Sequence, residues 1–399
     1  MFFRVLLLGL VLIPFYELFL YLLMPGAKVP EWIDMRVTKE YLAVGLATTL
    51  TIVSWKKSKS LNCPNFWILA FVGFLFLNLS KTPIAVTNPI IEVARMGSFP
   101  GEFKVLIFFL FFCSMTTVNI GKRQMEIIFK TIYLSGVVMA VYMIIQALKL
   151  DQIYRPLSSV EIGQVKSPAV AGFFGQPTLS VPFLCLTIPF AVYFKKWIGV
   201  IVIAIGTLLT GSDFAIICLM VLTLVYSVKN RWLLLVAFAS SLPVIYMMIK
   251  KTAHFFDFNG RLAVWGQILQ DVFTGTINGV TAHIGMTGAG FSNFGVVFTA
   301  LHQLPWSFAH NEYLHILWTC GCLGLAIFLM IHFDILKTIW QCRKSPEVIV
   351  LSMALLMLCV CACGTFVWQL GVYQFYTVVI VGLIYQIKKR LSNDLNTAN

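Results

Sequence analysis

The chain consists largely of long apolar runs separated by short polar connectors, and this repetition constrains its fold more than any other feature. A run such as RVLLLGLVLIPFYELFLYLLM, residues 4–24, has close to the ~20 residues that an α-helix needs to cross a bilayer. Because the bilayer interior offers no hydrogen-bond partners, a chain that crosses it repeatedly must satisfy its backbone within helices. The sequence therefore predicts an all-α polytopic membrane protein.

Composition supports this class, since 59% of the 399 residues are hydrophobic and only 11% are charged. An ordinary soluble domain has about 25% charged residues. We expect a single transmembrane domain, residues 1–399, with about twelve helices. The expected spans are about 4–24, 40–55, 64–80, 103–118, 127–148, 173–194, 197–211, 213–228, 231–249, 313–336, 347–367 and 371–387.

Basic residues indicate the orientation of the predicted bundle. Alternate short connectors carry Lys and Arg, in the sequences KKSK, GKR, KK and KNR and in the KKR of the C-terminal tail. Because cytoplasmic loops carry the excess of Lys and Arg, we expect both termini in the cytoplasm and the long loops outside. The net charge of +13 is then a topology signal, and no nucleic-acid partner is expected.

The longest expected outer loop, residues 250–312, is where we expect the function, because loops of this length are uncommon unless functional. It contains GRLAVWGQILQDVF, in which Arg261, Val264, Trp265 and Ile268 share one face at helical spacing. We expect an amphipathic helix along the outer membrane interface. The glycine-rich GMTGAGFSNFG that follows is suited to close approach of backbone to a ligand, but it has no Walker lysine.

The loop closes at SFAHNEYLHIL, residues 307–317. If a helix begins near Asn311 or Glu312, His310 lies at its N-terminus, where free N–H groups favour anions and a neutral imidazole. A neutral base, an anion site and the cationic Arg261 suit attack of a hydroxyl on a carbon that carries a phosphate leaving group. The alternative is structural: Asn311 caps the helix, Glu312 complements its dipole and His310 only packs at the interface.

Further polar residues lie near the outer ends of other spans. Arg155, Lys166 and Gln176 surround the outer end of the sixth span, and they are candidates to contact phosphates, sugars or lipid headgroups. Asp213, in LLTGSDFAI, is better explained as a loop carboxylate than as a catalytic acid. No spacing of His or Cys indicates a metal site, so neither a metal nor another cofactor is expected.

Five segments occur in an order that resembles a known superfamily: FFGQPTLSVPFLCLTIPF, LLTGSDFAI, GRLAVW, GAGFSNF and AHNEYLHILWTCGCLGL, over residues ~170–330. The resemblance is to the O-antigen ligase and O-antigen polymerase superfamily, which includes bacterial O-oligosaccharyltransferases. The last segment, with Gly321 and Gly324, is the most specific. Two positions depart from the family pattern, because Asp213 stands where an arginine is usual and Thr178 where an asparagine is usual.

The resemblance implies a GT-C-type glycosyltransferase of the bacterial inner membrane, active on the periplasmic side, with an undecaprenyl-diphosphate-linked glycan as donor. Arg261 would bind the donor diphosphate and His310 would activate the acceptor hydroxyl. Trp265 would pack against the lipid or a sugar, and Asn311 and Glu312 are further candidates for substrate binding. The acceptor is the lipid A core in a ligase, which we favour, another lipid-linked glycan in a polymerase, or a protein in an O-oligosaccharyltransferase.

A rival of another class is a transporter or flippase for the same lipid-linked glycan. Such a protein is expected to have internal repeats and charged or broken helices near the membrane midplane. The sequence has no convincing repeat, and its polar residues cluster at one expected surface instead. This pattern favours the enzyme over the carrier.

Overall fold

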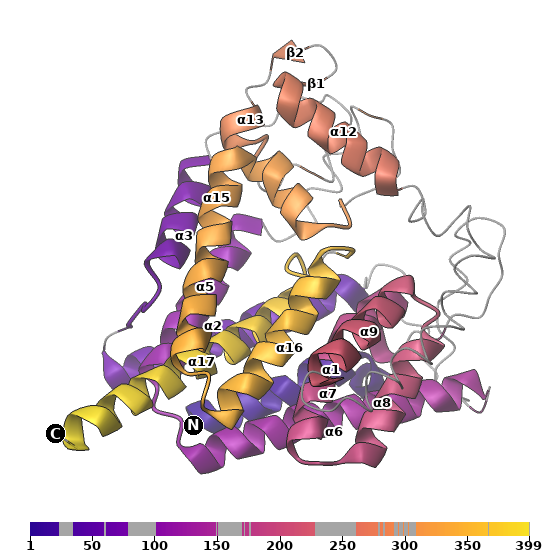
Figure 1. The fold of residues 1–399 in the computed structure, drawn as a ribbon, viewed down its shortest axis with the longest axis vertical. Coiled ribbons are helices and arrows are strands. Elements are labelled where there is room, and N and C mark those ends of the chain that lie inside the picture. Colours follow the sequence, from indigo (N-terminus) through magenta and orange to yellow (C-terminus); the bar gives the residue numbers. More distant parts are fainter. Residues whose placement is uncertain are drawn as a thin grey trace. The chain divides into compact units, whose positions relative to one another are not determined.

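Helices make up nearly all of the secondary structure in the computed structural model of the chain (Figure 1). The chain forms two units, each built from three separate stretches of sequence. The first unit comprises Met1–Ala43, Ile120–Phe256 and Pro346–Cys361, and the second comprises Val44–Asn119, Asp257–Ser345 and Ala362–Asn399. The structure describes residues 1–23, 35–59, 61–78, 101–148, 150, 170, 172–174, 177–227, 261–277, 280–281, 284–290, 294, 298, 302, 309–365 and 367–398.

The first unit is a bundle of helices packed around α6 (Lys122–Ala147), which contacts α1, α7 and α8. Small residues let these apolar helices approach closely, because a side chain at Gly206 of α8 would come within 2.8 Å of Ala140 in α6. The other elements of this unit are α1 (Phe2–Leu23), η1 (Gly172–Phe174), α7 (Pro177–Tyr193), α8 (Trp197–Leu209), α9 (Asp213–Ser227) and α16 (Pro346–Ala362).

In its described residues the second unit combines five helices with a smaller subassembly built from the long loop of the sequence. Within it α17 packs against α5, and α15 packs against α3, α12 and α13. The strands form one short antiparallel hairpin between α12 and α13. Its elements are α2 (Met35–Ser58) from Val44 onward, α3 (Phe66–Asn78), α5 (Gly101–Thr117), α12 (Arg261–Thr274), β1 (Thr276–Ile277), β2 (Val280–Thr281), α13 (Ile284–Thr287), α15 (Glu312–Gln341) and α17 (Gly371–Ala398).

The helix α15 is broken at Gly321, which has φ 69° and ψ −173°. The carbonyls of Trp318 and Thr319 accept hydrogen bonds from the backbone N–H groups of Ala289 (3.0 Å) and Gly290 (2.8 Å). The glycine-rich stretch was expected to let backbone approach a ligand; in the structure its backbone approaches α15. The polar groups that the break would leave unpaired are satisfied in this way.

The break folds the two arms of α15 toward each other. The rings of Tyr313 and Phe328 have centroids 6.1 Å apart, although their 15-residue separation along a straight helix would place them roughly 22 Å apart. The second arm, residues 322–341, has about 20 residues and so spans roughly 30 Å. The break therefore separates a short arm that carries the candidate site from a long apolar arm.

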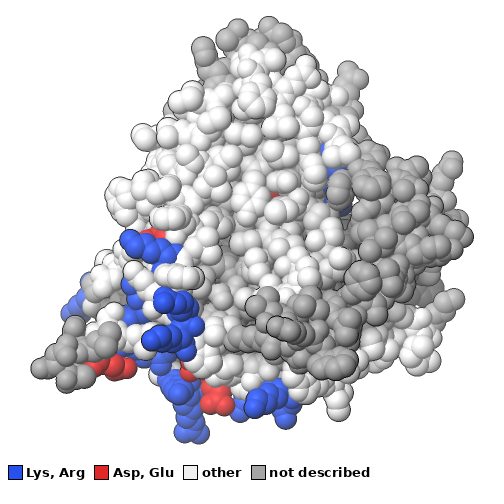
Figure 2. Space-filling model, in the orientation of Figure 1, with Lys and Arg blue, Asp and Glu red and all other residues white. Residues whose placement is uncertain are grey.

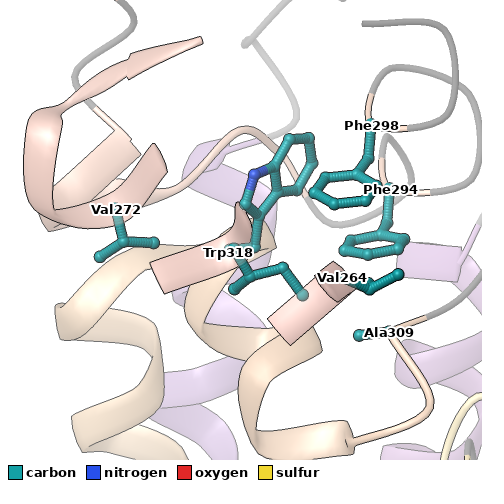
Figure 3. Close-up of a cluster of buried hydrophobic side chains, with 7 residues drawn as sticks. Val264, Val272, Phe294, Phe298, Ala309 and Trp318 are labelled. Carbon is teal, nitrogen blue, oxygen red and sulfur yellow. The ribbon is translucent and has the colours of Figure 1, made fainter. Parts of the chain in front are cut away.

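The predicted apolar face of α12 exists, but it packs against protein. Val264 and Ile268 are buried in a cluster that also contains Trp318 of α15 (Figure 3). In this close-up Trp318 lies beside Phe294 and Phe298, with ring centroids 5.3 and 5.5 Å from them. Burial of this face fixes α12 on the short arm of α15, because apolar area removed from water is the dominant stabilising term.

Of the twelve expected spans, eleven overlap a helix, and the other one, 231–249, lies outside the described residues. Among the described residues, two helices, α6 and α15, are long and apolar enough to cross a membrane. This helical architecture is consistent with a helical membrane protein.

Candidate functional site

The candidate site lies at the start of α15, where the sequence predicted it. Asn311 is the N-cap residue, and its side-chain oxygen accepts hydrogen bonds from the N–H groups of Tyr313 (3.0 Å) and Leu314 (3.1 Å). Asparagine is among the best N-cap residues because it satisfies N–H groups that the helix cannot. The capping role in the structural alternative is therefore confirmed for Asn311.

His310 precedes the cap in a left-handed backbone conformation, with φ 52°. Few residues other than glycine adopt this conformation, so the backbone here is held by its surroundings. Burial lowers the pKa of His310 from 6.5 to about 3, and the positive charge of Arg261 is a second, smaller cause of this shift. The imidazole is therefore neutral at pH 7, as expected from the sequence, but the main cause is burial.

Arg261 is the first residue of α12, and its side chain is only 8% exposed. One guanidinium nitrogen, Nη1, donates a hydrogen bond to the carbonyl oxygen of Gly364 at 2.8 Å. A buried cation needs such a partner, because removing it from water costs several kcal/mol. The two residues singled out as catalytic are thus close enough to interact electrostatically, through the effect of Arg261 on the His310 pKa.

The residues between α16 and α17, here called the 363–369 segment, were not expected to belong to the site. Asn311 Nδ2 donates to the carbonyl of Cys363 at 3.1 Å. Glu312 is 1% exposed, and its carboxylate accepts hydrogen bonds from Trp368 N (2.6 Å), Gln369 N (3.0 Å) and Gln369 Nε2 (3.1 Å). The polar Trp-Gln pair near the end of an apolar span was the only sequence signal for this segment.

Asn311 and Glu312 thus bind the protein itself. Their contact with substrate remains a prediction, as does the role of Trp265. The indole Nε1 of Trp265 donates to the carbonyl of Ala309 at 2.8 Å, so this half-buried ring joins α12 to the residue before His310. Each of these side chains helps to hold His310 in place.

A second buried polar group fixes the far end of α12. Asp271 is 2% exposed, and its Oδ2 contacts His302 Nε2 at 2.8 Å and accepts a hydrogen bond from Trp318 Nε1 at 2.9 Å. Gln267 Nε2 donates to the other oxygen at 3.0 Å. This network was not expected from the sequence, because residues 31 and 47 positions from Asp271 are brought to it only by the fold. Within the described residues no cluster of His, Cys, Asp or Glu is arranged to hold a metal ion.

Three expected substrate contacts, Arg155, Lys166 and Gln176, lie outside the described residues. Thr178 lies within α7, and Asp213 is the first residue of α9; both belong to the first unit, and their side chains are not described. The structure therefore brings together Arg261, Trp265, His310, Asn311 and Glu312 from the expected set.

Three consecutive basic residues of α17 lie at the end of this helix opposite the candidate site. α17 begins at Gly371, just after the 363–369 segment, and Tyr385, roughly 20 Å further along this helix, donates a hydrogen bond to Asp334 of α15. Beyond it come Lys388, Lys389 and Arg390. Figure 2 shows that Lys and Arg gather around the C-terminal part of α17, whereas most of the other described surface in view is uncharged.

Neither of the comparisons with known proteins finds a relative. No protein-family model matches the chain, and no curated protein matches it. A function must therefore be inferred from the geometry of the residues described above.

Proposed function

We propose that the chain is a glycosyltransferase of the bacterial inner membrane that transfers a glycan from undecaprenyl diphosphate to an acceptor hydroxyl on the periplasmic side. The O-antigen ligase reaction, with the lipid A core of lipopolysaccharide as acceptor, is the favoured form. The observation that carries the proposal is the neutral His310, partly buried at a helix N-terminus beside the buried cation of Arg261.

The proposed reaction is a substitution at the anomeric carbon of the donor sugar. The acceptor oxygen forms a bond to that carbon, and the bond from the carbon to the phosphate oxygen breaks, so the diphosphate leaves with the electron pair. His310 takes the proton of the attacking hydroxyl, which requires the neutral imidazole. Arg261 stabilises the charge on the leaving diphosphate.

The charge distribution supports a periplasmic site. In the second unit the basic cluster Lys388, Lys389 and Arg390 follows Tyr385 of α17, whereas His310 and Arg261 lie near the other end of that helix, at Gly371. Because basic segments remain in the cytoplasm, the end with His310 is proposed to face the periplasm. We also propose that all twelve expected spans cross the membrane.

One departure from the family pattern affects the leaving group. With Asp213 in place of the usual arginine, a second cation must come from elsewhere if the diphosphate is to be fully neutralised. Arg155 and Lys166 are the proposed substitutes. A polymerase or a protein O-oligosaccharyltransferase would use the same residues with a different acceptor.

The break in α15 is the observation that favours the rival transporter, because broken helices commonly form transport sites. The carbonyls of Trp318 and Thr319 at this break, however, accept hydrogen bonds from Ala289 and Gly290. These oxygens are therefore engaged by the protein, and the enzyme is the better supported proposal.

The transfer reaction can be tested with the purified protein in proteoliposomes that contain an undecaprenyl-diphosphate-linked oligosaccharide. Lipid A core, a second lipid-linked glycan and a protein are each offered as acceptor. We expect glycosylated lipid A core and free undecaprenyl diphosphate in equal amounts. A transporter would move the donor across the bilayer without cleaving it, and lack of cleavage with all three acceptors would refute the proposal.

The pH dependence of transfer tests the state of His310. A base with a pKa of about 3 stays neutral when the pH falls from 8 to 5, so the titration of His310 is not expected to lower kcat/KM over this range. An ordinary histidine with a pKa near 6.5 would be protonated there, and the rate at pH 5 would be about 30-fold lower. Because burial raises the pKa of Glu312 to about 7, its protonation would also lower the rate in this range. The profile is therefore measured in Glu312→Gln as well, which has no carboxyl group at this position, and an acid limb centred near pH 6.5 that persists in this variant would contradict the assignment of His310.

A further inference from the structure

We infer that Glu312 is a positioning residue of this site: it holds the 363–369 segment so that the carbonyl of Gly364 fixes Arg261 near His310. The inference deepens the proposed function and rests on it where activity is concerned. It assigns Glu312 a different role from substrate contact or helix-dipole complementation, which the sequence suggested.

The 363–369 segment is hydrogen-bonded at both of its ends. At the first end, Arg261 donates to Gly364 O (2.8 Å) and Asn311 donates to Cys363 O (3.1 Å). At the second end, Glu312 accepts three hydrogen bonds from Trp368 and Gln369. Since Asn311 and Glu312 directly follow His310, the same short piece of chain that carries the base also binds both ends of the segment that binds Arg261.

Two residues from other helices, Lys104 and Gln374, also bind the second end of the 363–369 segment. Lys104 of α5 donates through Nζ to the carbonyl of Gln369, and Gln374 of α17 donates to the carbonyl of Trp368. Lys104 also interacts electrostatically with Glu312. The peptide groups around Trp368 and Gln369 are therefore bound through both N–H and C=O groups.

The hydrogen-bond donors around Glu312 are suited to a carboxylate as their acceptor. All three groups that face Glu312 are N–H donors, and an ionised carboxylate accepts hydrogen bonds without donating any. Burial raises the pKa of Glu312 to about 7, whereas the hydrogen bonds from Gln369 and Trp368 and the charge of Lys104 favour the ionised form. Hydrogen bonds to a charged acceptor are roughly twice as strong as neutral ones. The start of α15 does not need this carboxylate as a cap, because Asn311 already accepts hydrogen bonds from two N–H groups there. Glu312 is therefore dedicated to the neighbouring segment.

Aromatic packing around Trp368 is expected to confine the effect of a change at Glu312 to the neighbouring backbone. The ring of Trp368 lies 5.9 Å from that of Tyr313 and 5.4 Å from that of Phe328, between the two arms of α15. These contacts do not involve the Glu312 carboxylate, so they hold the tryptophan ring when the carboxylate is changed. We therefore expect a change at Glu312 to shift the backbone of the segment while the fold persists.

The test is the substitution Glu312→Gln together with its reversal in the double variant E312Q/Q369E. Glutamine keeps one oxygen for the two backbone N–H groups, but it presents its NH₂ to the NH₂ of Gln369. We expect kcat for transfer to fall by about 100-fold with little change in KM, because a misplacement of about 1 Å has this effect. In the double variant the glutamine NH₂ faces a carboxylate again, and we expect kcat to return to near the wild-type value.

A second readout does not depend on activity. NMR titration of isotope-labelled histidine, assigned with His310→Gln, reports the pKa of His310. When Arg261 moves away, this pKa is expected to rise from its value of about 3, and it should fall again in E312Q/Q369E. The control is Glu126→Gln, the same chemical change at an exposed position in α6, which should alter neither kcat nor the pKa.

The outcomes separate the inference from the proposed function. If Glu312→Gln leaves both kcat and the pKa of His310 at wild-type values, Glu312 is not a positioning residue. If the wild type transfers no glycan but the pKa of His310 follows Glu312, the positioning role stands and the proposed function is wrong. Should Glu312→Gln fail to fold, Gln369→Ala, which removes only the Nε2 hydrogen bond, decides: a rise in the pKa of His310 supports the inference, and an unchanged pKa overturns it.

Discussion

Replacement of His310 by alanine is expected to lower the rate constant of glycan transfer by about 10²- to 10⁴-fold, the range in which a general base contributes. The acceptor hydroxyl would then have to lose its proton to water while it attacks the donor sugar. Donor binding should change much less, because Arg261 remains. The measurement is single-turnover transfer in proteoliposomes at saturating donor, with thermal unfolding to verify the fold.

The left-handed backbone at residue 310 calls for a second variant. Asparagine tolerates this conformation better than alanine but is not a base. We expect His310→Asn to be as inactive as His310→Ala and to unfold at the wild-type temperature. Gln270→Ala, at an exposed position on α12, is the control and should transfer normally. Wild-type rates for both His310 variants would mean that the structural alternative is right and that His310 only packs beside the cap.

Replacement of Gly321 by alanine is expected to abolish folding of the second unit or to lower its stability severely. The φ and ψ angles of Gly321, 69° and −173°, belong to a region that is essentially restricted to glycine, and adopting it costs other residues about 1–3 kcal/mol. A Cβ atom there would also lie 2.4 Å from the backbone of Met286. Because this neighbour is backbone, the clash cannot be relieved by a side-chain rotation, and the contact between the glycine-rich stretch and α15 must open.

The folded yield and the thermal unfolding temperature in detergent measure this effect. Gly266→Ala is the matched control, because this glycine lies inside α12 and a Cβ atom added to it would have no neighbour within 4 Å. Alanine there is expected to stabilise the helix by about 0.5–1 kcal/mol. If Gly321→Ala melts at the wild-type temperature, α15 is not broken at this residue.

Local sequence signals predicted the helix ends of the candidate site. Asn311 and Glu312 precede a long apolar run, and the structure starts α15 at Glu312 with Asn311 as its cap. The spacing of Arg261, Val264 and Ile268 predicted an amphipathic helix along the membrane interface. The helix exists and α12 begins at Arg261, but its apolar face is buried against protein. Both predictions depend on interactions within one or two helical turns, which a short stretch of sequence contains in full.

Contacts between distant residues were not predictable in this way. The hydrogen bonds from Arg261 to Gly364, from Asn311 to Cys363 and from Glu312 to Trp368 and Gln369 join residues 52 to 103 positions apart. The partner of the glycine-rich stretch could not be predicted for the same reason, because it is the backbone of α15 around Thr319. Nothing in the composition of these segments says which other segment lies beside them.

The sequence by itself determined the helical class, the starts of α12 and α15 and the residue types of the candidate site, because hydrophobic periodicity and helix capping are local properties. Only the tertiary structure decided that α15 breaks at Gly321, that the 363–369 segment joins Arg261 to the residues after His310, and that Glu312 binds this segment. These features arise from packing and from the need to pair every buried polar group. Both depend on which parts of the chain meet in space.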